Sequence, residues 1–248
     1  MNNLIEEGAV CGSDGCSISP VAADAPKTAT SDARLAHELT IVSDVICPWC
    51  FVAKKNLEKA LELAGAEFSV KITWRPFELN PGMPKASMSR REYRSKKFGS
   101  WEQSQHLDAQ VADAAKLAGI TFRHDLIART PNTFAAHRLI WLAGEEGVQD
   151  DVVEALFRAY FVEGRDVGDT QVLAEIAKQA GLKNSVVAAF LEGAGADEVR
   201  RESETARVGG ISGVPTFILD GEALFSGAMK PENMAARLQE AAAAHAKG

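Results

Sequence analysis

A cysteine pair at the junction of a strand pattern and a helical pattern constrains this chain most. The segment Cys-Pro-Trp-Cys, residues 47–50, directly follows the apolar run 39–43 and directly precedes a helical pattern. Cysteines at this spacing at the start of a helix lie on one face and can reach each other. The unpaired N–H groups and the positive dipole end of the helix stabilise a thiolate, which is the reactive form of cysteine. Cys47 and Cys50 therefore indicate a thiol–disulfide redox centre.

Composition and charge narrow the classes of function. The chain has 248 residues, of which 46% are hydrophobic and 25% are charged, as in ordinary globular proteins. Its net charge of -7 argues against a nucleic-acid partner, because phosphate binding requires a basic face. No apolar run approaches transmembrane length, so we expect no membrane partner. The N-terminus lacks the basic start and the apolar stretch of a secretory signal, which favours a cytoplasmic location.

The cysteines form two close pairs, Cys11 with Cys16 and Cys47 with Cys50. In a reducing cytosol such pairs indicate redox work or metal binding rather than structural disulfides. The intervening residues 12–15, Gly-Ser-Asp-Gly, form a flexible turn that lets the sulfurs of Cys11 and Cys16 meet. We therefore hypothesise that a mobile arm carries a second redox pair that exchanges with Cys47–Cys50. The alternatives are incidental thiols of an exposed tail and transient metal capture.

Periodicity predicts the order of the regular elements. They are a strand over 39–43, a helix over 48–64 ended by Gly65, a strand over 70–75, a long helical block, strands 216–219 and 223–225 joined by Asp220-Gly221, and a helix from Pro231. Within the block, Thr130 and Pro131 are expected to be the N-cap and first residue of a helix. The following charged side chains are expected to face water: Lys54, Lys55, Glu58, Lys59, Glu62, Arg90, Arg91, Arg94, Lys96 and Lys97.

The element order predicts the organisation of the chain. A strand, a helix and a strand in succession imply a right-handed parallel crossover, and the two ends of the chain together form a small α/β sheet domain. We expect a flexible N-terminal arm with a cysteine pair over 1–37. The sheet domain is expected over 38–82 and 207–248, and a helical insertion subdomain over 83–206.

Several stretches of the chain resemble a known family. They are residues 43–50 (SDVICPWC), 75–81 (RPFELNP), 132–139 (NTFAAHRL) and 212–217 (SGVPTF). With the helical insert, they resemble the DsbA-like branch of the thioredoxin fold, and within it the FrnE group, from about residue 39 to the C-terminus. The resemblance implies an α/β fold, thioredoxin-like with a large all-helical insertion. It also implies a thiol–disulfide oxidoreductase or isomerase.

The resemblance implies roles for four residues. Cys47 is the attacking thiol, Cys50 is the resolving thiol, and Pro215 is a cis-proline that faces the redox pair. Val214 offers its backbone groups to an extended substrate chain by strand addition. The substrates implied are thiol or disulfide proteins and small thiols. No cofactor is expected beyond the reversible Cys47–Cys50 disulfide, and glutathione is a candidate redox partner.

Three further residues are candidates for substrate contact. Pro48 presets the helix start, and Trp49 offers an apolar surface beside the sulfur or is a packing residue. His137 shares a predicted helix with Trp141. It is either a group that assists proton transfer or contacts substrate, or a packing residue of the core.

Three alternatives stay open at the level of sequence. The two cysteine pairs could together form a four-thiolate zinc site, although the strand and helix around the second pair favour redox work, and we expect no metal. Glutathione-dependent 2-hydroxychromene-2-carboxylate isomerases and kappa-class glutathione transferases share the fold but carry serine at the position of Cys47. A thiol-based metal-binding or chaperone-like module is the non-enzymatic alternative.

Overall fold

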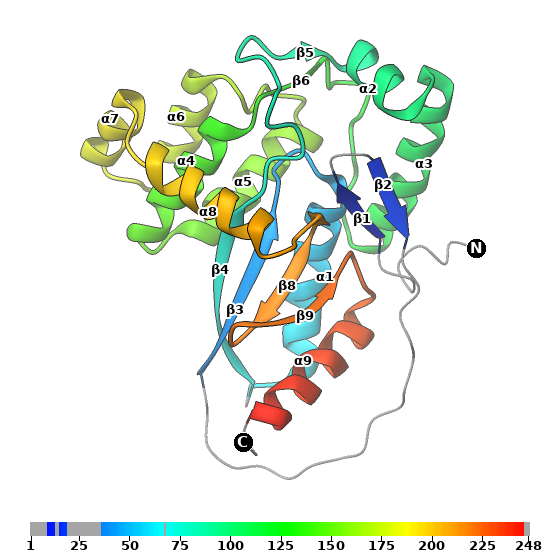
Figure 1. Cartoon of the computed structure of the whole chain (residues 1–248), viewed down its shortest axis with the longest axis vertical. Helices are drawn as coiled ribbons and strands as arrows, with labels where there is room; N and C mark the ends of the chain where they lie inside the picture. Colours follow the sequence, from blue (N-terminus) through cyan, green and yellow to red (C-terminus); the bar gives the residue numbers. More distant parts are fainter. Residues whose placement is uncertain (1–8, 13–14, 19–35, 67, 246–248) are drawn as a thin grey trace.

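The computed structural model describes residues 9–12, 15–18, 36–66 and 68–245, with only the backbone described for residues 9–12, 15–18 and 36. Most of the flexible arm predicted over residues 1–37 therefore lies outside the described part. Two short strands lie in the described part of this arm, although the sequence shows no strand periodicity there: β1 (Ala9–Gly12) and β2 (Gly15–Ile18). They form a hairpin that pairs with β7 (Gly213–Val214) in the order β2-β1-β7 (Figure 1).

A four-stranded mixed sheet forms the centre of the molecule. Its strands are β3 (Ala36–Ser43), β4 (Ser69–Pro76), β8 (Thr216–Leu219) and β9 (Glu222–Ser226), in the order β4-β3-β8-β9. β3 is parallel to β4 and antiparallel to β8, and β8 is antiparallel to β9. The helices α1 (Pro48–Ala64) and α9 (Pro231–His245) pack against each other beside this sheet (Figure 1).

The predicted elements of this sheet unit are confirmed in order and nearly in length. β3 buries Leu39, Ile41 and Val42, as expected for an apolar run in the interior of a sheet. α1 spans the predicted residues and is followed by its C-cap residue Gly65, whose φ of 85° suits a glycine. The hairpin turn after β8 contains Gly221 with a φ of 87°, as the Asp-Gly sequence predicts.

The long helical block is also confirmed. Its elements are α2 (Arg90–Phe98), α3 (Trp101–Leu117), α4 (Phe134–Glu145), α5 (Gln149–Phe161), α6 (Thr170–Gln179), α7 (Asn184–Glu192) and α8 (Ala196–Val208). These helices gather at the carboxyl end of β3 (Figure 1). The division into 38–82, 83–206 and 207–248 stays a prediction, and α8 continues across the expected boundary after residue 206.

The predicted start of one helix is wrong. Thr130 lies in a short strand, β6 (Arg129–Thr130), and pairs with Met88 of β5 (Met88–Ser89). α4 begins at Phe134, whose N–H donates to the side-chain oxygen of Asn132 at 3.0 Å. The side chain of Asn132 thus accepts one of the N–H groups at the helix start that lack a partner within the helix. The sequence predicted this capping role for Thr130.

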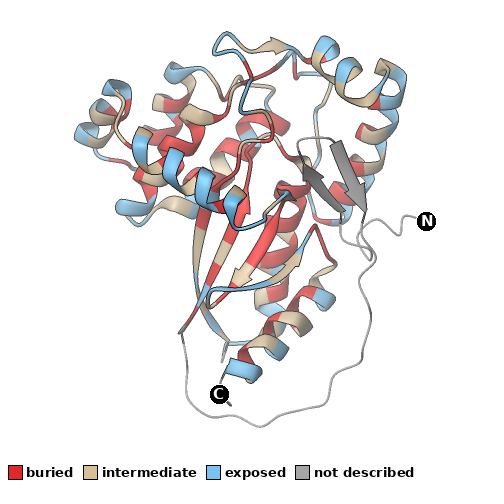
Figure 2. Ribbon diagram, in the orientation of Figure 1, coloured by how far each residue is buried: buried red, intermediate tan, exposed pale blue. Residues whose placement is uncertain are grey.

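The hydrophobic core is continuous from the sheet into the helical block. Buried residues line β3, β8, α1 and the inner faces of the surrounding helices (Figure 2). Phe51 of α1 stacks on Phe157 of α5 with ring centroids 5.0 Å apart. Trp74 of β4 meets the same Phe157 edge-on at 6.4 Å. The helix that carries the cysteine pair is therefore fixed by the helical block as well as by its own sheet.

Candidate active site

The turn between β3 and α1 positions Cys47. Cys47 is the N-cap residue of α1 with extended backbone, and Pro48 is the first helical residue. The N–H of Cys47 donates to the carbonyl oxygen of Asp44 at 3.0 Å, and the N–H of Cys50 donates to the carbonyl oxygen of Cys47 at 3.1 Å. Proline suits the first helical position because its ring presets φ and its missing N–H has no partner there. The strand, turn and helix thus place Cys47 at the positive end of the helix dipole.

The two thiols of the motif differ in environment. Both are free thiols and both are buried, with exposed fractions of 0% for Cys47 and 1% for Cys50. Burial raises the pKa of the Cys50 thiol well above its ordinary value, and the neighbouring Cys47 raises it further. The hydroxyl of Ser43 and the backbone of Asp44 oppose this shift in pKa. Cys50 is therefore a protonated thiol at neutral pH, suited to act second rather than first.

The segment around Pro215 faces the cysteine pair. The Val214–Pro215 peptide bond is cis, as the resemblance implied. The thiol of Cys47 donates to the carbonyl oxygen of Val214 with a sulfur–oxygen distance of 3.7 Å. The carbonyl of Pro215 accepts the N–H of Gly227 at 2.8 Å, which ties this segment to the end of β9. Residues more than 160 positions apart in the chain thus meet at one site.

A buried acid and a buried imidazole lie beside this pair. Asp44 is 0% exposed, and its Oδ2 accepts the N–H of Leu79 at 2.8 Å. His137 of α4 is 3% exposed, and its Nε2 lies 3.5 Å from Oδ1 of Asp44. Among the residues that the structure describes, this Nε2 has no hydrogen-bond partner. His137 therefore faces Asp44 in the interior, which favours a role through Asp44 over direct contact with substrate.

Glu78 belongs to this group and was not singled out from the sequence. Burial raises the pKa of its carboxyl, the charge of Asp44 adds to the rise, and the charge of His137 opposes it. Its stretch, 75–81, carried the family resemblance, but nothing in the spacing indicated that Glu78 would lie close to His137.

The remaining candidate residues differ in how exposed they are and in how fully the structure describes them. Trp49 is only 6% exposed and belongs to the hydrophobic core, so it packs rather than offers an open surface. Pro48 is half-buried. The candidate pair Cys11 and Cys16 lies in β1 and β2, where the backbone register is described but the side chains are not.

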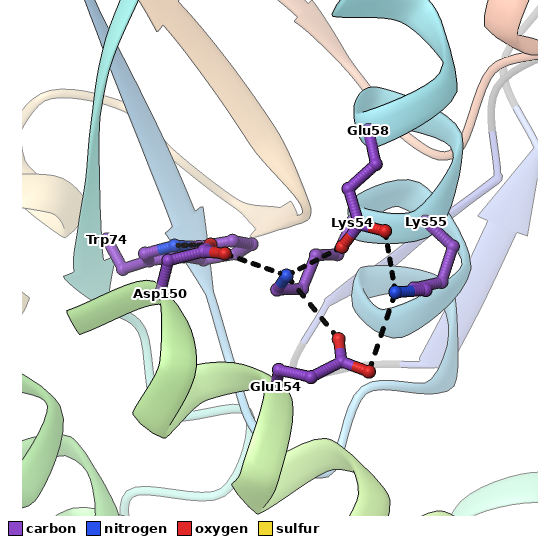
Figure 3. Close-up of polar contacts among 6 residues, drawn as sticks. All are labelled: Lys54, Lys55, Glu58, Trp74, Asp150 and Glu154. Carbon is purple, nitrogen blue, oxygen red and sulfur yellow. Dashed lines mark hydrogen bonds and ion pairs between the residues drawn. The ribbon is translucent and has the colours of Figure 1, made fainter. Parts of the chain in front are cut away.

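A network of charges holds α1 next to α5 and β4 (Figure 3). Lys54, one turn after Cys50, is 3% exposed, so the prediction that it faces water is wrong. Its Nζ lies 2.8 Å from Glu58, 2.9 Å from Asp150 and 3.4 Å from Glu154. The indole N–H of Trp74 donates to Asp150 at 2.9 Å. Burial opposes protonation of Lys54, but the hydrogen bond to Glu58 and the charge of Asp150 raise its pKa overall.

The basic cluster after residue 89 is also not wholly exposed. Arg90 is 6% exposed and its guanidinium lies 2.7 Å from Asp108. Arg94 lies 2.8 Å from the other oxygen of the same carboxylate. The expectation of a solvated basic face is therefore wrong for these two residues, because α3 packs on α2 and supplies the carboxylate.

Within the described residues, no three His, Cys, Asp or Glu side chains come close enough together to hold a metal ion. The four-thiolate alternative requires Cys11 and Cys16, whose side chains lie outside the described part. Over the same described residues, no helix is long and apolar enough to cross a membrane.

The family follows from comparison with known proteins. Residues 38–239 match the family described as the DSBA-like thioredoxin domain. The chain belongs to this family, which makes it an enzyme of the disulfide oxidoreductase kind acting on thiols and disulfides. The predicted DsbA-like fold is thereby confirmed. The narrower assignment to the FrnE group stays a prediction.

Three known proteins illustrate the match. The chain is similar to a probable DsbA oxidoreductase from Streptomyces coelicolor, with 35% identity, a TM-score of 0.76, and coverage of 84% of this chain and 90% of that one. It is 28% identical to the uncharacterized protein YwbO of Bacillus subtilis over 77% of this chain and 90% of that protein. The cytosolic disulfide reductase DsbM of Pseudomonas aeruginosa shares the fold, with 21% identity, a TM-score of 0.60, and coverage of 84% and 99%.

Proposed function

We propose that this protein catalyses dithiol–disulfide exchange through Cys47 and Cys50. The observation that carries the proposal is the position of Cys47 at the N-terminus of α1, with its thiol against the Val214 carbonyl and Cys50 buried behind it. This arrangement gives one thiol a thiolate-stabilising helix end and keeps the other protonated until it is needed.

The exchange has two steps. The Cys47 thiolate attacks one sulfur of a substrate disulfide, forming a mixed disulfide and releasing the other substrate sulfur as a thiolate. Cys50 then loses its proton and attacks the sulfur of Cys47, which releases the second substrate thiolate and leaves the Cys47–Cys50 disulfide. The substrate gains two electrons and the enzyme loses two. The reverse sequence introduces a disulfide into a substrate dithiol, and the relative reduction potentials decide the direction.

The backbone beside Pro215 supplies the binding element of the proposal. β7 ends at Val214, next to Cys47, so an extended substrate chain paired with β7 would hold its disulfide near the attacking sulfur. Substrates of this kind are proteins with exposed disulfides, with small thiols as further partners. The structure of the Pseudomonas aeruginosa reductase with glutathione supports glutathione as one such partner. That relative's description as cytosolic supports a cytoplasmic location. We propose no cofactor beyond the reversible disulfide and no resident metal.

Neighbouring residues have supporting roles in this proposal. Trp49 packs the start of α1, and Pro48 is the half-buried residue of the motif next to the entering substrate. His137 lies against the Asp44 carboxylate on its interior side. A glutathione-dependent isomerase or transferase is the alternative, and it is disfavoured because that class carries serine where this chain has Cys47.

Insulin reduction by dithiothreitol tests the proposal. The protein should accelerate the reaction, and Cys47→Ser should reduce the rate to that of dithiothreitol alone. Cys50→Ser is the matched variant: it retains the nucleophile, so it should lose turnover but accumulate a mixed disulfide between Cys47 and insulin, seen by mass spectrometry. Full activity of Cys47→Ser would refute the assignment.

A further inference from the structure

The hairpin near the N-terminus occupies the edge of β7 where a substrate strand would bind. β1 runs antiparallel to β7, with Cys11 opposite Val214 and Gly12 opposite Gly213. β1 also contacts α1, the helix that carries the redox pair (Figure 1). Val214 is therefore the common neighbour of two groups: the thiol of Cys47, which donates to its carbonyl, and the backbone of Cys11, which is paired with it across the sheet.

The burial of Cys47 fits an occupied site. Its exposed fraction is 0% in the chain with the hairpin in place. A thiol that attacks an external disulfide must be reached in line by the incoming sulfur. Since the edge of β7 is paired with β1, a substrate strand can bind there only after β1 leaves. The hairpin and an external substrate therefore compete for one position.

The backbone register also brings the two cysteines of the hairpin together. Cys11 and Cys16 are direct partners in the antiparallel pair of β1 and β2. Opposed residues in such a pair have Cα atoms about 4.5 to 5.5 Å apart. A disulfide accepts Cα separations of about 4.4 to 6.8 Å. The backbone of the hairpin is thus compatible with a Cys11–Cys16 disulfide without rearrangement.

We propose that the β1–β2 hairpin is a built-in substrate strand of the redox site, docked on β7, and that its cysteine pair exchanges disulfides with Cys47–Cys50 within one chain. The inference rests on the proposed function of Cys47 and adds its first reaction partner. The Cys47 thiolate attacks a sulfur of the Cys11–Cys16 disulfide and forms a mixed disulfide, and one hairpin thiolate leaves. Cys50 loses its proton and displaces the hairpin sulfur from Cys47. The active pair is then a disulfide and the hairpin a dithiol, so two electrons pass from Cys47–Cys50 to the hairpin.

The mixed disulfide can be trapped in the full-length Cys50→Ser variant. The variant is reduced, given one equivalent of diamide, and quenched with N-ethylmaleimide, and its disulfides are mapped by non-reducing digestion and mass spectrometry. We expect Cys47 linked to Cys11 or Cys16 within the monomer, in a yield that does not change when the protein is diluted. A Cys47 that captures insulin but never links to the hairpin would overturn this inference and leave the proposed function intact. A Cys47 that captures neither would refute the proposed function itself.

Alkylation of Cys47 tests the docking of the hairpin separately. Gly12 lies in the middle strand of β2-β1-β7, so Gly12→Pro removes an N–H from this sheet. We expect iodoacetamide to modify Cys47 at least about ten-fold faster in Gly12→Pro, because opening of the site no longer requires β1 to unpair. The double variant Cys11→Ser/Cys16→Ser keeps the backbone strand and should retain slow alkylation. An unchanged rate in Gly12→Pro would show that β1 does not cover the site.

Discussion

Cys47 and Cys50 show how residue-scale surroundings separate two identical side chains. The helix start and the Val214 carbonyl surround the first thiol, whereas burial raises the pKa of the second. The order of attack that we propose uses this difference: Cys47 acts first from the helix start, and Cys50, protonated and therefore a poor nucleophile, acts second.

Because the side chain of His124 is largely buried, we expect the stability of the protein to depend on pH. Burial, with the charges of Arg90 and Arg94, lowers the pKa of His124 to about 4, and the charge of Asp108 opposes the shift. An unfolded histidine has a pKa of about 6.5, so between these values the unfolded chain binds the additional proton. The free energy of unfolding should therefore fall as the pH falls from about 6.5 to about 4, by up to about 3 kcal/mol from this residue.

Urea unfolding at several pH values measures this contribution. As the pH is lowered through this range, the natural protein should lose more free energy of unfolding than His124→Gln, because the variant has no imidazole to protonate. His106→Gln, on an exposed position of α3, is the control for loss of an imidazole, and its curve should parallel that of the natural protein. Parallel curves for His124→Gln would contradict the prediction.

For single residues, the sequence predicts which side chains are reactive more readily than it predicts which other side chains surround them. The spacing of Cys47 and Cys50 predicts the redox pair, because the chemistry is local to one turn of helix. It could not predict that Lys54 is buried or that Glu78 lies near His137. Those surroundings depend on α4 and α5, which fold onto the site from about 60 to 100 residues further along the chain.

The network around Lys54 makes a prediction at the scale of elements. Lys54→Met keeps the length of the side chain but leaves Glu58 of α1 and the α5 carboxylates Asp150 and Glu154 without the cation they share. We expect a loss of about 2 kcal/mol in the free energy of unfolding, less than for a fully buried pair because the carboxylates are partly exposed. Lys55→Met is the matched control: Lys55 is more exposed and pairs with Glu58 and Glu154, so its loss should be under about 1 kcal/mol.

Denaturant unfolding of both variants decides the point. Equal losses for Lys54→Met and Lys55→Met would mean that burial of Lys54 adds nothing to the contact between α1 and α5. Redox activity measured on the folded variants reports whether this contact also positions Cys47, since Lys54 lies on the helix that carries it.

Element-scale prediction from sequence succeeded where periodicity is sustained and failed where partners are distant. α1, the helical block as a whole and the final hairpin follow from apolar periodicity and turn residues. β1 and β2 do not, because β1 pairs with β7, some 200 residues away, and β2 adds to the other edge of β1. Short paired segments of this kind carry too few side chains for a pattern to show.

For the whole molecule, the order of the elements and the family resemblance predicted the fold, but the packing of the helical block on the sheet required the structure. Phe51 and Trp74 of the sheet unit and Phe157 of α5 form one aromatic cluster. Because they share this core, we expect the sheet unit and the helical block to unfold together rather than one at a time.

Two probes of urea unfolding test this cooperativity. Far-UV circular dichroism reports mainly the helical block, and alkylation of Cys50, which is 1% exposed, reports opening of the redox unit. We expect the two midpoints to coincide. Phe157→Leu should lower both together, with a loss of about 1 to 2 kcal/mol, because the smaller side chain leaves a gap against Phe51. A helical signal lost at urea concentrations where Cys50 is still protected would show that the helical block unfolds on its own, and the aromatic cluster would then be a contact between two separately stable units.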